Sequence, residues 1–168
     1  GSIAIADLDA DGKPEVASAG GNHLVVAHNI SGTPIEPLSY EVAWYTQYDN
    51  LFNEDIPTHI AVDSGGNIVV AGSTYFTANE NDIQVIKLDS AGNLLWEYVY
   101  NGDGDHYDVV YELRIDPSDN IIITGESWGP SFSIQWATIK LDPGGAELWV
   151  NRYDGGNPQA SQYPRGME

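Results

Sequence analysis

Short runs that alternate apolar and polar residues, or that string β-branched residues together, recur along this chain. The runs 58–62, 68–71, 82–88 and 94–100 are separated by turn sequences rich in Gly, Asn and Asp. A period of two predicts β-strands, whereas no segment shows the 3.6-residue apolar period of an amphipathic helix. We therefore expect an all-β protein of short antiparallel strands.

The strand pattern repeats at a spacing of 53 residues. A register held this long indicates a duplicated structural unit. Four-stranded units with a period near 50 and one recurring aromatic residue are typical of β-propeller blades. The matched residues are Asp63 and Asp116, Asn67 and Asn120, Gly72 and Gly125, Lys87 and Lys140, Asp89 and Asp142, Trp96 and Trp149, and Tyr100 and Tyr153.

Residues 1–53 follow the same plan, since Trp44 lies 52 positions before Trp96. We expect a single β-propeller module over residues 1–168. Three such blades cannot close a ring, because propellers typically have four to eight. Either the sequence is a piece of a longer propeller, or copies of the chain complete one another. The expected parts are blades at about 1–53, 54–105 and 106–157, then the start of a fourth blade or an exchanged strand at 158–168.

Composition narrows the choice of partners. Twenty-five acidic against six basic residues give a formal charge of −19, which argues against a nucleic-acid partner. No run approaches the roughly 20 apolar residues of a membrane span, so we expect no membrane insertion. The sequence has no cysteine, which excludes disulfides and thiolate chemistry.

The stretch "DLDADGKPE" carries the clearest candidate chemistry. Asp7, Asp9 and Asp11 alternate, so their carboxylates can turn toward one ion. Lys13 would add its backbone carbonyl and Glu15 a further carboxylate. Calcium takes six to eight such oxygen ligands. We expect a calcium site that stiffens this hairpin; a solvated acidic turn or a magnesium site are the alternatives.

A second acidic loop, "NGDGDHYD", allows two interpretations. Asn101, Asp103 and Asp105 alternate, so a second cation site is conceivable. Alternatively the loop is structural, because Asp108 matches Asp55 in the repeat. We favour the structural interpretation. Aspartates of the repeated turns are expected to cap those turns in the same way, by accepting backbone hydrogen bonds.

The aromatic residues divide into two groups. Tryptophans that recur once per blade, such as Trp96 and Trp149, are expected to pack neighbouring blades together. The repeated lysines are expected to pair with acids of their blades. Tyr75 and Trp128 occupy matched positions just after the second strand, where we expect a loop. They form a possible ligand face with Asp103 and Asp105, either as platforms for sugar rings or as half-buried anchors.

Two resemblances bear on these patterns. Residues of about 55–157 resemble the microbial SBBP-type propeller repeat, because "VDSGGNIVVAG" matches "IDPSDNIIITG", and "IKLD" and "LW" recur in both units. The stretch "IAIADLDADGKPEVASAG" in residues 1–53 resembles the FG-GAP/VCBS type of propeller repeat, whose D-x-D-x-D-G loop binds calcium. Both resemblances imply propellers on exported or cell-surface proteins, usually as non-catalytic modules.

We therefore expect a non-catalytic, calcium-binding β-propeller module outside the cell or on its surface. It would serve as a scaffold, adhesion or self-assembly domain that binds a protein, a glycan or copies of itself. Four scattered histidines and the lack of a nucleophile elbow give an enzyme little support. A carbohydrate-binding propeller is the first alternative and a polysaccharide-active enzyme domain the second.

Overall fold

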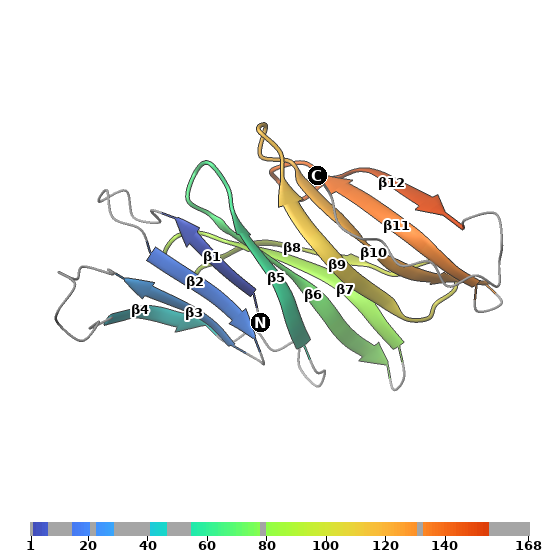
Figure 1. The fold of residues 1–168 in the computed structure, drawn as a ribbon, viewed down its shortest axis with the longest axis horizontal. Coiled ribbons are helices and arrows are strands. Elements are labelled where there is room, and N and C mark those ends of the chain that lie inside the picture. The colour runs from blue at the N-terminus through green and yellow to red at the C-terminus, as the bar shows by residue number, and fades with distance from the viewer. Residues whose placement is uncertain are drawn as a thin grey trace.

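In the computed structural model, the described residues are 2–6, 15–20, 23–28, 41–46, 55–77, 80–130 and 133–154, with side chains over 56–74, 81–130 and 133–154. Their strands form three four-stranded antiparallel sheets that stand in an open row (Figure 1). There is no α-helix in these ranges. The predicted all-β class is confirmed.

Each sheet is a meander, in which neighbouring strands follow one another along the chain. The first sheet comprises β1 (Ser2–Ala6), β2 (Glu15–Gly20), β3 (His23–His28) and β4 (Glu41–Thr46). The second comprises β5 (Asp55–Val62), β6 (Ile68–Thr77), β7 (Glu80–Leu88) and β8 (Leu94–Tyr100). The third comprises β9 (Asp108–Ile115), β10 (Ile121–Gly129), β11 (Ser133–Leu141) and β12 (Glu147–Tyr153).

The predicted loop position of Tyr75 and Trp128 is wrong, because both residues lie inside strands. β6 continues to Thr77 and β10 to Gly129, where each still pairs with the strand that follows. Alternation alone suggested an earlier end at the glycine of each second strand. That glycine instead stands at a shift in the ladder register, as at Gly125.

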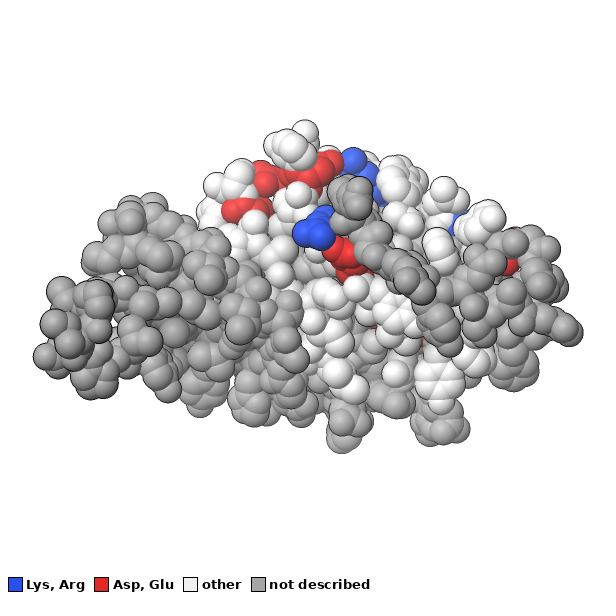
Figure 2. Space-filling view, viewed as in Figure 1, with Lys and Arg blue, Asp and Glu red and all other residues white. Residues whose placement is uncertain are grey.

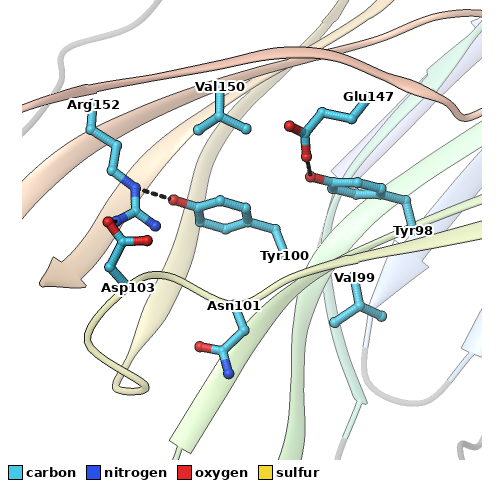
Figure 3. A pocket seen from close by; sticks show the side chains of 8 residues that line it. All are labelled: Tyr98, Val99, Tyr100, Asn101, Asp103, Glu147, Val150 and Arg152. Atoms are coloured by element: carbon cyan, nitrogen blue, oxygen red, sulfur yellow. Dashed lines mark hydrogen bonds and ion pairs between the residues drawn. The ribbon is translucent and has the colours of Figure 1, made fainter.

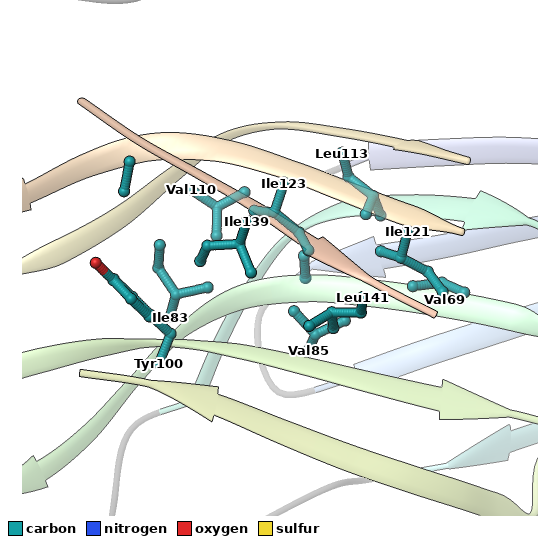
Figure 4. Packing of buried hydrophobic residues seen from close by; sticks show 12 residues of the cluster. Val69, Ile83, Val85, Tyr100, Val110, Leu113, Ile121, Ile123, Ile139 and Leu141 are labelled. Carbon is teal, nitrogen blue, oxygen red and sulfur yellow. The ribbon is translucent and has the colours of Figure 1, made fainter. Parts of the chain in front are cut away.

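The core lies between the second and third sheets, which pack face to face (Figure 4). Alternation along each strand directs its apolar side chains to this side. Full burial of an Ile, Leu or Val side chain is worth about 1.5–3 kcal/mol, so this contact is the main source of stability that holds the two sheets together. The buried cluster comprises Val69, Ala71, Ile83, Val85, Tyr100, Val110, Leu113, Ile121, Ile123, Ala137, Ile139 and Leu141.

The repeated turns are closed by their aspartates, as predicted. Asp63, Asp89, Asp116 and Asp142 each accept backbone N–H bonds from the residues two and four positions later, at 2.8–2.9 Å. These bonds satisfy amides that the strand ladders leave unpaired. The turns therefore fix the strand ends that carry the Lys87–Asp63 and Lys140–Asp116 pairs.

Candidate functional site

The predicted calcium loop connects two paired strands. Ala6 at the end of β1 is the register partner of Glu15 at the start of β2. The backbone therefore brings the two ends of the acidic stretch next to each other, as a hairpin ligand loop requires. Asp7, Asp9, Asp11 and Lys13 lie outside the described residues, as does the side chain of Glu15. The calcium assignment stays a prediction.

The loop before β9 is organised by Asp108. Its side chain is fully buried, and its Oδ2 accepts a hydrogen bond from the Gly102 amide at 2.7 Å. Burial raises the pKa of the Asp108 carboxyl, and hydrogen bonds from Ser127 and Gly102 oppose this shift without cancelling it. The structural role predicted for Asp108 is confirmed.

The acids of this loop are not brought together around a common point. Asp103, which is 75% exposed, forms an ion pair with Arg152 at 2.5 Å. Asp105 has a positive φ of 51° and accepts a hydrogen bond from Asn101 at 2.7 Å. Across the side chains that the structure describes, no three His, Cys, Asp or Glu residues form a group that could hold a metal. The geometry gives a second cation site no support.

Trp128 is a half-buried anchor of the same loop. Its Nε1 donates to the carboxylate of Glu126 at 2.6 Å, and its ring meets that of Tyr107 edge to face at 5.9 Å. Its amide also donates to the Tyr107 carbonyl. Trp128 thus contacts the loop 101–108, whereas the side chain of Tyr75 lies outside the described residues, so the ligand face stays a prediction.

A row of polar contacts joins the second sheet to the third, and we call it the seam. At one end, Lys87 forms a buried ion pair with Asp63 at 2.7 Å. The same ammonium donates to the Pro143 carbonyl at 3.0 Å, which also accepts the Trp96 Nε1–H at 3.1 Å. Two donors from adjacent strands of one sheet thus hold a single turn carbonyl of the next sheet. The predicted Lys–acid pair and the packing role of Trp96 are confirmed.

At its other end the seam widens into a groove of about 510 Å³ (Figure 3). The Tyr98 hydroxyl donates to Glu147 at 2.6 Å, and Arg152 Nε donates to the Tyr100 hydroxyl at 2.7 Å. Burial, and then the Glu147 carboxylate, raise the pKa of Tyr98. The polar groups of the groove bond to each other across the two sheets, so its main action is to fix their spacing.

Glu147 and Arg152 were missed by the repeat analysis, because neither is a repeated residue. Their counterparts 53 positions earlier are Leu94 and Val99. These departures were the available signal, since a charge that replaces an apolar repeat residue marks a contact particular to one sheet. In Figure 2, acidic and basic side chains of the described part adjoin one another along the upper margin.

The third sheet has a second face, directed away from the seam. We call it the open face, formed by Ile122, Trp136, Thr138, Lys140, Trp149 and Tyr153. Lys140 repeats Lys87 and pairs with Asp116 at 2.8 Å, but its side chain is 22% exposed where that of Lys87 is 5% exposed. The open face thus carries the chemistry of the seam in a more accessible setting.

The aromatic residues are also more exposed on the open face than their repeat partners are at the seam. Tyr100 at the seam is 6% exposed, whereas its repeat partner Tyr153 is 59% exposed and Trp149 is 44% exposed. Trp136 meets Tyr153 edge to face at 6.2 Å. Four apolar side chains on the face of the second sheet that packs against the third are fully buried, namely Val69, Ala71, Ile83 and Val85. Three of their counterparts on the open face, namely Ile122, Trp136 and Thr138, are only partly buried.

Comparisons with known proteins add no assignment. No protein-family model matches the sequence, and a search of curated proteins finds no match. Among the residues that the structure describes, no helix has the length and apolarity of a membrane span.

Proposed function

We propose that this chain is a non-catalytic scaffold of β-propeller blades that acts by binding a further folded β-sheet on its open face. The observation that carries the proposal is the repetition of the seam donors there. Lys140 and Trp149 are ladder partners, as Lys87 and Trp96 are, and both pairs precede a shift in strand register.

The exposure of the open face supports a binding role. Trp and Tyr are the residues in which binding energy concentrates at protein interfaces, since each removes a large apolar area from water and keeps one polar group. Trp149 and Tyr153 combine such areas on the last strand of the third sheet. The indole and ammonium donors beside them would give a partner its register.

The proposal has two further parts, a bound calcium ion and a location outside the cell or on its surface. The stretch 7–15 would hold one calcium ion and stiffen the hairpin between β1 and β2. Four carboxylates within nine residues repel one another without a cation, so ion binding and hairpin folding would be coupled. The acidic composition and the resemblance to surface propeller repeats support a place outside the cell or on its surface.

An extended chain tests whether the open face accepts a sheet. In the variant, residues 105–157 are repeated once more after residue 157, which keeps the 53-residue register. With 5-fluorotryptophan incorporated, the Trp149 resonance in ¹⁹F NMR is assigned through Trp149→Phe. We expect the extension to protect the Trp149 resonance from broadening by a soluble paramagnetic agent and to leave Trp96 unchanged, because Trp96 already packs at the seam.

The same spectra contain the control and the opposing outcome. An unchanged Trp96 resonance shows that the second and third sheets remain docked in the extended chain. If the paramagnetic agent then broadens the Trp149 resonance as strongly as in residues 1–168, the open face does not bind a sheet and the proposed function is wrong.

A further inference from the structure

We infer that the partner of the open face is the first sheet of a second copy of this chain, so that the three described sheets of each copy together close a ring of six. This inference rests on the proposed function and names its partner. The open face lies at one end of the row of sheets, and the first sheet lies at the other end (Figure 1).

The arrangement of the row suits a head-to-tail contact. β1 and β2 of the first sheet contact β5, and β5, β6 and β7 of the second sheet contact β9 of the third. Successive sheets thus stack in one direction, and a second copy continues the stack. A head-to-tail contact yields a ring if its rotation closes and a filament if it does not. Six sheets lie within the four to eight of closed propellers.

The seam supplies the template for this contact. Across it, Lys87 and Trp96 hold one carbonyl oxygen of the approaching sheet, that of Pro143. Lys140 and Trp149 face each other across β11 and β12 in the same ladder relation. We infer that they hold a backbone carbonyl of the partner's first sheet in the same way, while Tyr153 is covered as Tyr100 is.

Charge sets the conditions for closure. Each copy carries a formal charge of −19, so the two copies repel each other at long range. Salt screens such repulsion, with a Debye length of about 8 Å at physiological ionic strength. Contacts within the open face are short-range and largely apolar, so added salt should strengthen the dimer. A contact held together by ion pairs would weaken instead.

The test measures the mass of residues 1–168 by light scattering and sedimentation, in physiological salt with millimolar calcium. We expect a discrete species of twice the 18.2 kDa chain mass. Trp149→Asp should shift the equilibrium to monomer, and Lys140→Met should raise the dissociation constant about tenfold. Leu148→Ala is the matched control, because Leu148 is 51% exposed beside Trp149 but has no ladder partner in β11.

A single-cysteine variant separates the two ways in which copies can meet. The chain has no cysteine, so Thr138→Cys places one thiol on the open face. Head-to-tail closure keeps these thiols apart, and oxidation should yield no disulfide-linked dimer. A rapid disulfide-linked dimer would show that two open faces meet each other, which overturns the inference.

The remaining outcomes are also decisive. Masses that grow beyond twice the chain mass as concentration rises indicate a filament and overturn the closed ring, and a dimer unaffected by Trp149→Asp overturns the assigned face. A monomer at all concentrations overturns the second copy as partner. If the extended chain nevertheless protects Trp149, the proposed function stands and only this inference fails. Circular dichroism confirms that each variant is folded.

Discussion

At the scale of single residues, two lysines at one position of the repeat have different surroundings. Lys87 and Asp63 are both almost completely buried, whereas Lys140 and Asp116 are about one-fifth exposed. Burial alone would raise the pKa of Asp63, but hydrogen bonds from Lys87 and Asn67 outweigh it and lower that pKa. The buried Asp63 carboxyl is therefore ionised, and it is kept so by the hydrogen bonds from Lys87 and Asn67.

This difference predicts unequal costs for the same substitution. Lys87→Met leaves a buried carboxylate without its cation and should lower the free energy of unfolding by about 3 kcal/mol. Lys140→Met leaves Asp116 in contact with water and should cost about 1 kcal/mol or less. Urea denaturation of both variants at low protein concentration measures the two costs. Equal losses in the free energy of unfolding would show that burial does not distinguish the Lys87–Asp63 pair from the Lys140–Asp116 pair.

Asp108 gives a prediction about pH. Because burial raises its pKa above the ordinary 3.8, the folded chain holds a proton that the unfolded chain has released. This contribution to stability is fully present below pH 3.8 and is lost as pH rises through the raised pKa. Wild-type stability relative to Asp108→Asn should therefore fall across that window and level off above it.

The quantity to measure is the difference in the free energy of unfolding between wild type and Asp108→Asn. A hydrogen bond from Lys140 lowers the pKa of Asp116, so that group changes stability with pH in the opposite direction. Urea denaturation of wild type and Asp108→Asn at matched pH values cancels such terms. A difference that stays constant, or that grows in favour of wild type as pH rises, contradicts the assignment.

At the scale of elements, the ladders between the first two strands of the second and third sheets each depend on a glycine at their register shift. A Cβ at Gly125 would collide with the carbonyl oxygen of Val109 on the neighbouring strand. The β9–β10 ladder brings the two backbones this close because the register shifts here. The second sheet repeats the arrangement at Gly72, where a Cβ would collide with the Ile56 carbonyl.

Gly125→Ala should therefore destabilise the chain by about 3 kcal/mol, since the obstacle is backbone rather than a movable side chain. Gly144→Ala is the control, because a Cβ there meets only the Asp142 carboxylate, at 3.3 Å. That variant should stay within about 0.5 kcal/mol of wild type. The midpoints of thermal unfolding compare the two. A mild effect of Gly125→Ala would mean that the ladder can relax at this point.

At the scale of the whole molecule, calcium should act on the first sheet. Its hairpin lies between Ala6 and Glu15, which the β1–β2 ladder pairs. We expect millimolar calcium to raise the melting temperature and EGTA to lower it by several degrees, because the ion binds only the folded loop. Asp9→Ala should abolish the calcium response. Asp105→Ala should retain it, since Asp105 bonds within another loop.

Calorimetric titration gives the stoichiometry of this site. One calcium per chain, lost in Asp9→Ala, is the expected result. A melting temperature that is the same in calcium and in EGTA would contradict the calcium assignment, although the open-face proposal would remain. A second calcium that disappears with Asp105→Ala would restore the loop 101–108 as a candidate site.

Local patterns were sufficient for most of the fold. Strand β8 was predicted with its observed bounds, and the four-stranded plan expected for residues 1–53 is observed in the first sheet. The turn aspartates were assigned correctly because their bonds join residues two to four positions apart. The ends of β6 and β10 were missed, since a glycine that serves a ladder shift has the same appearance in the sequence as one that ends a strand.

The sequence by itself determined the all-β class, the 53-residue repeat and the pairing of each repeated lysine with an acid of its own unit. All of these depend on short-range periodicity or on the copying of one unit. Only the tertiary structure decided which copy of a repeated residue is buried. Lys87 and Lys140 are equivalent as sequence, and they differ because one sheet has a neighbour packed on that face and the other presents the face to solvent.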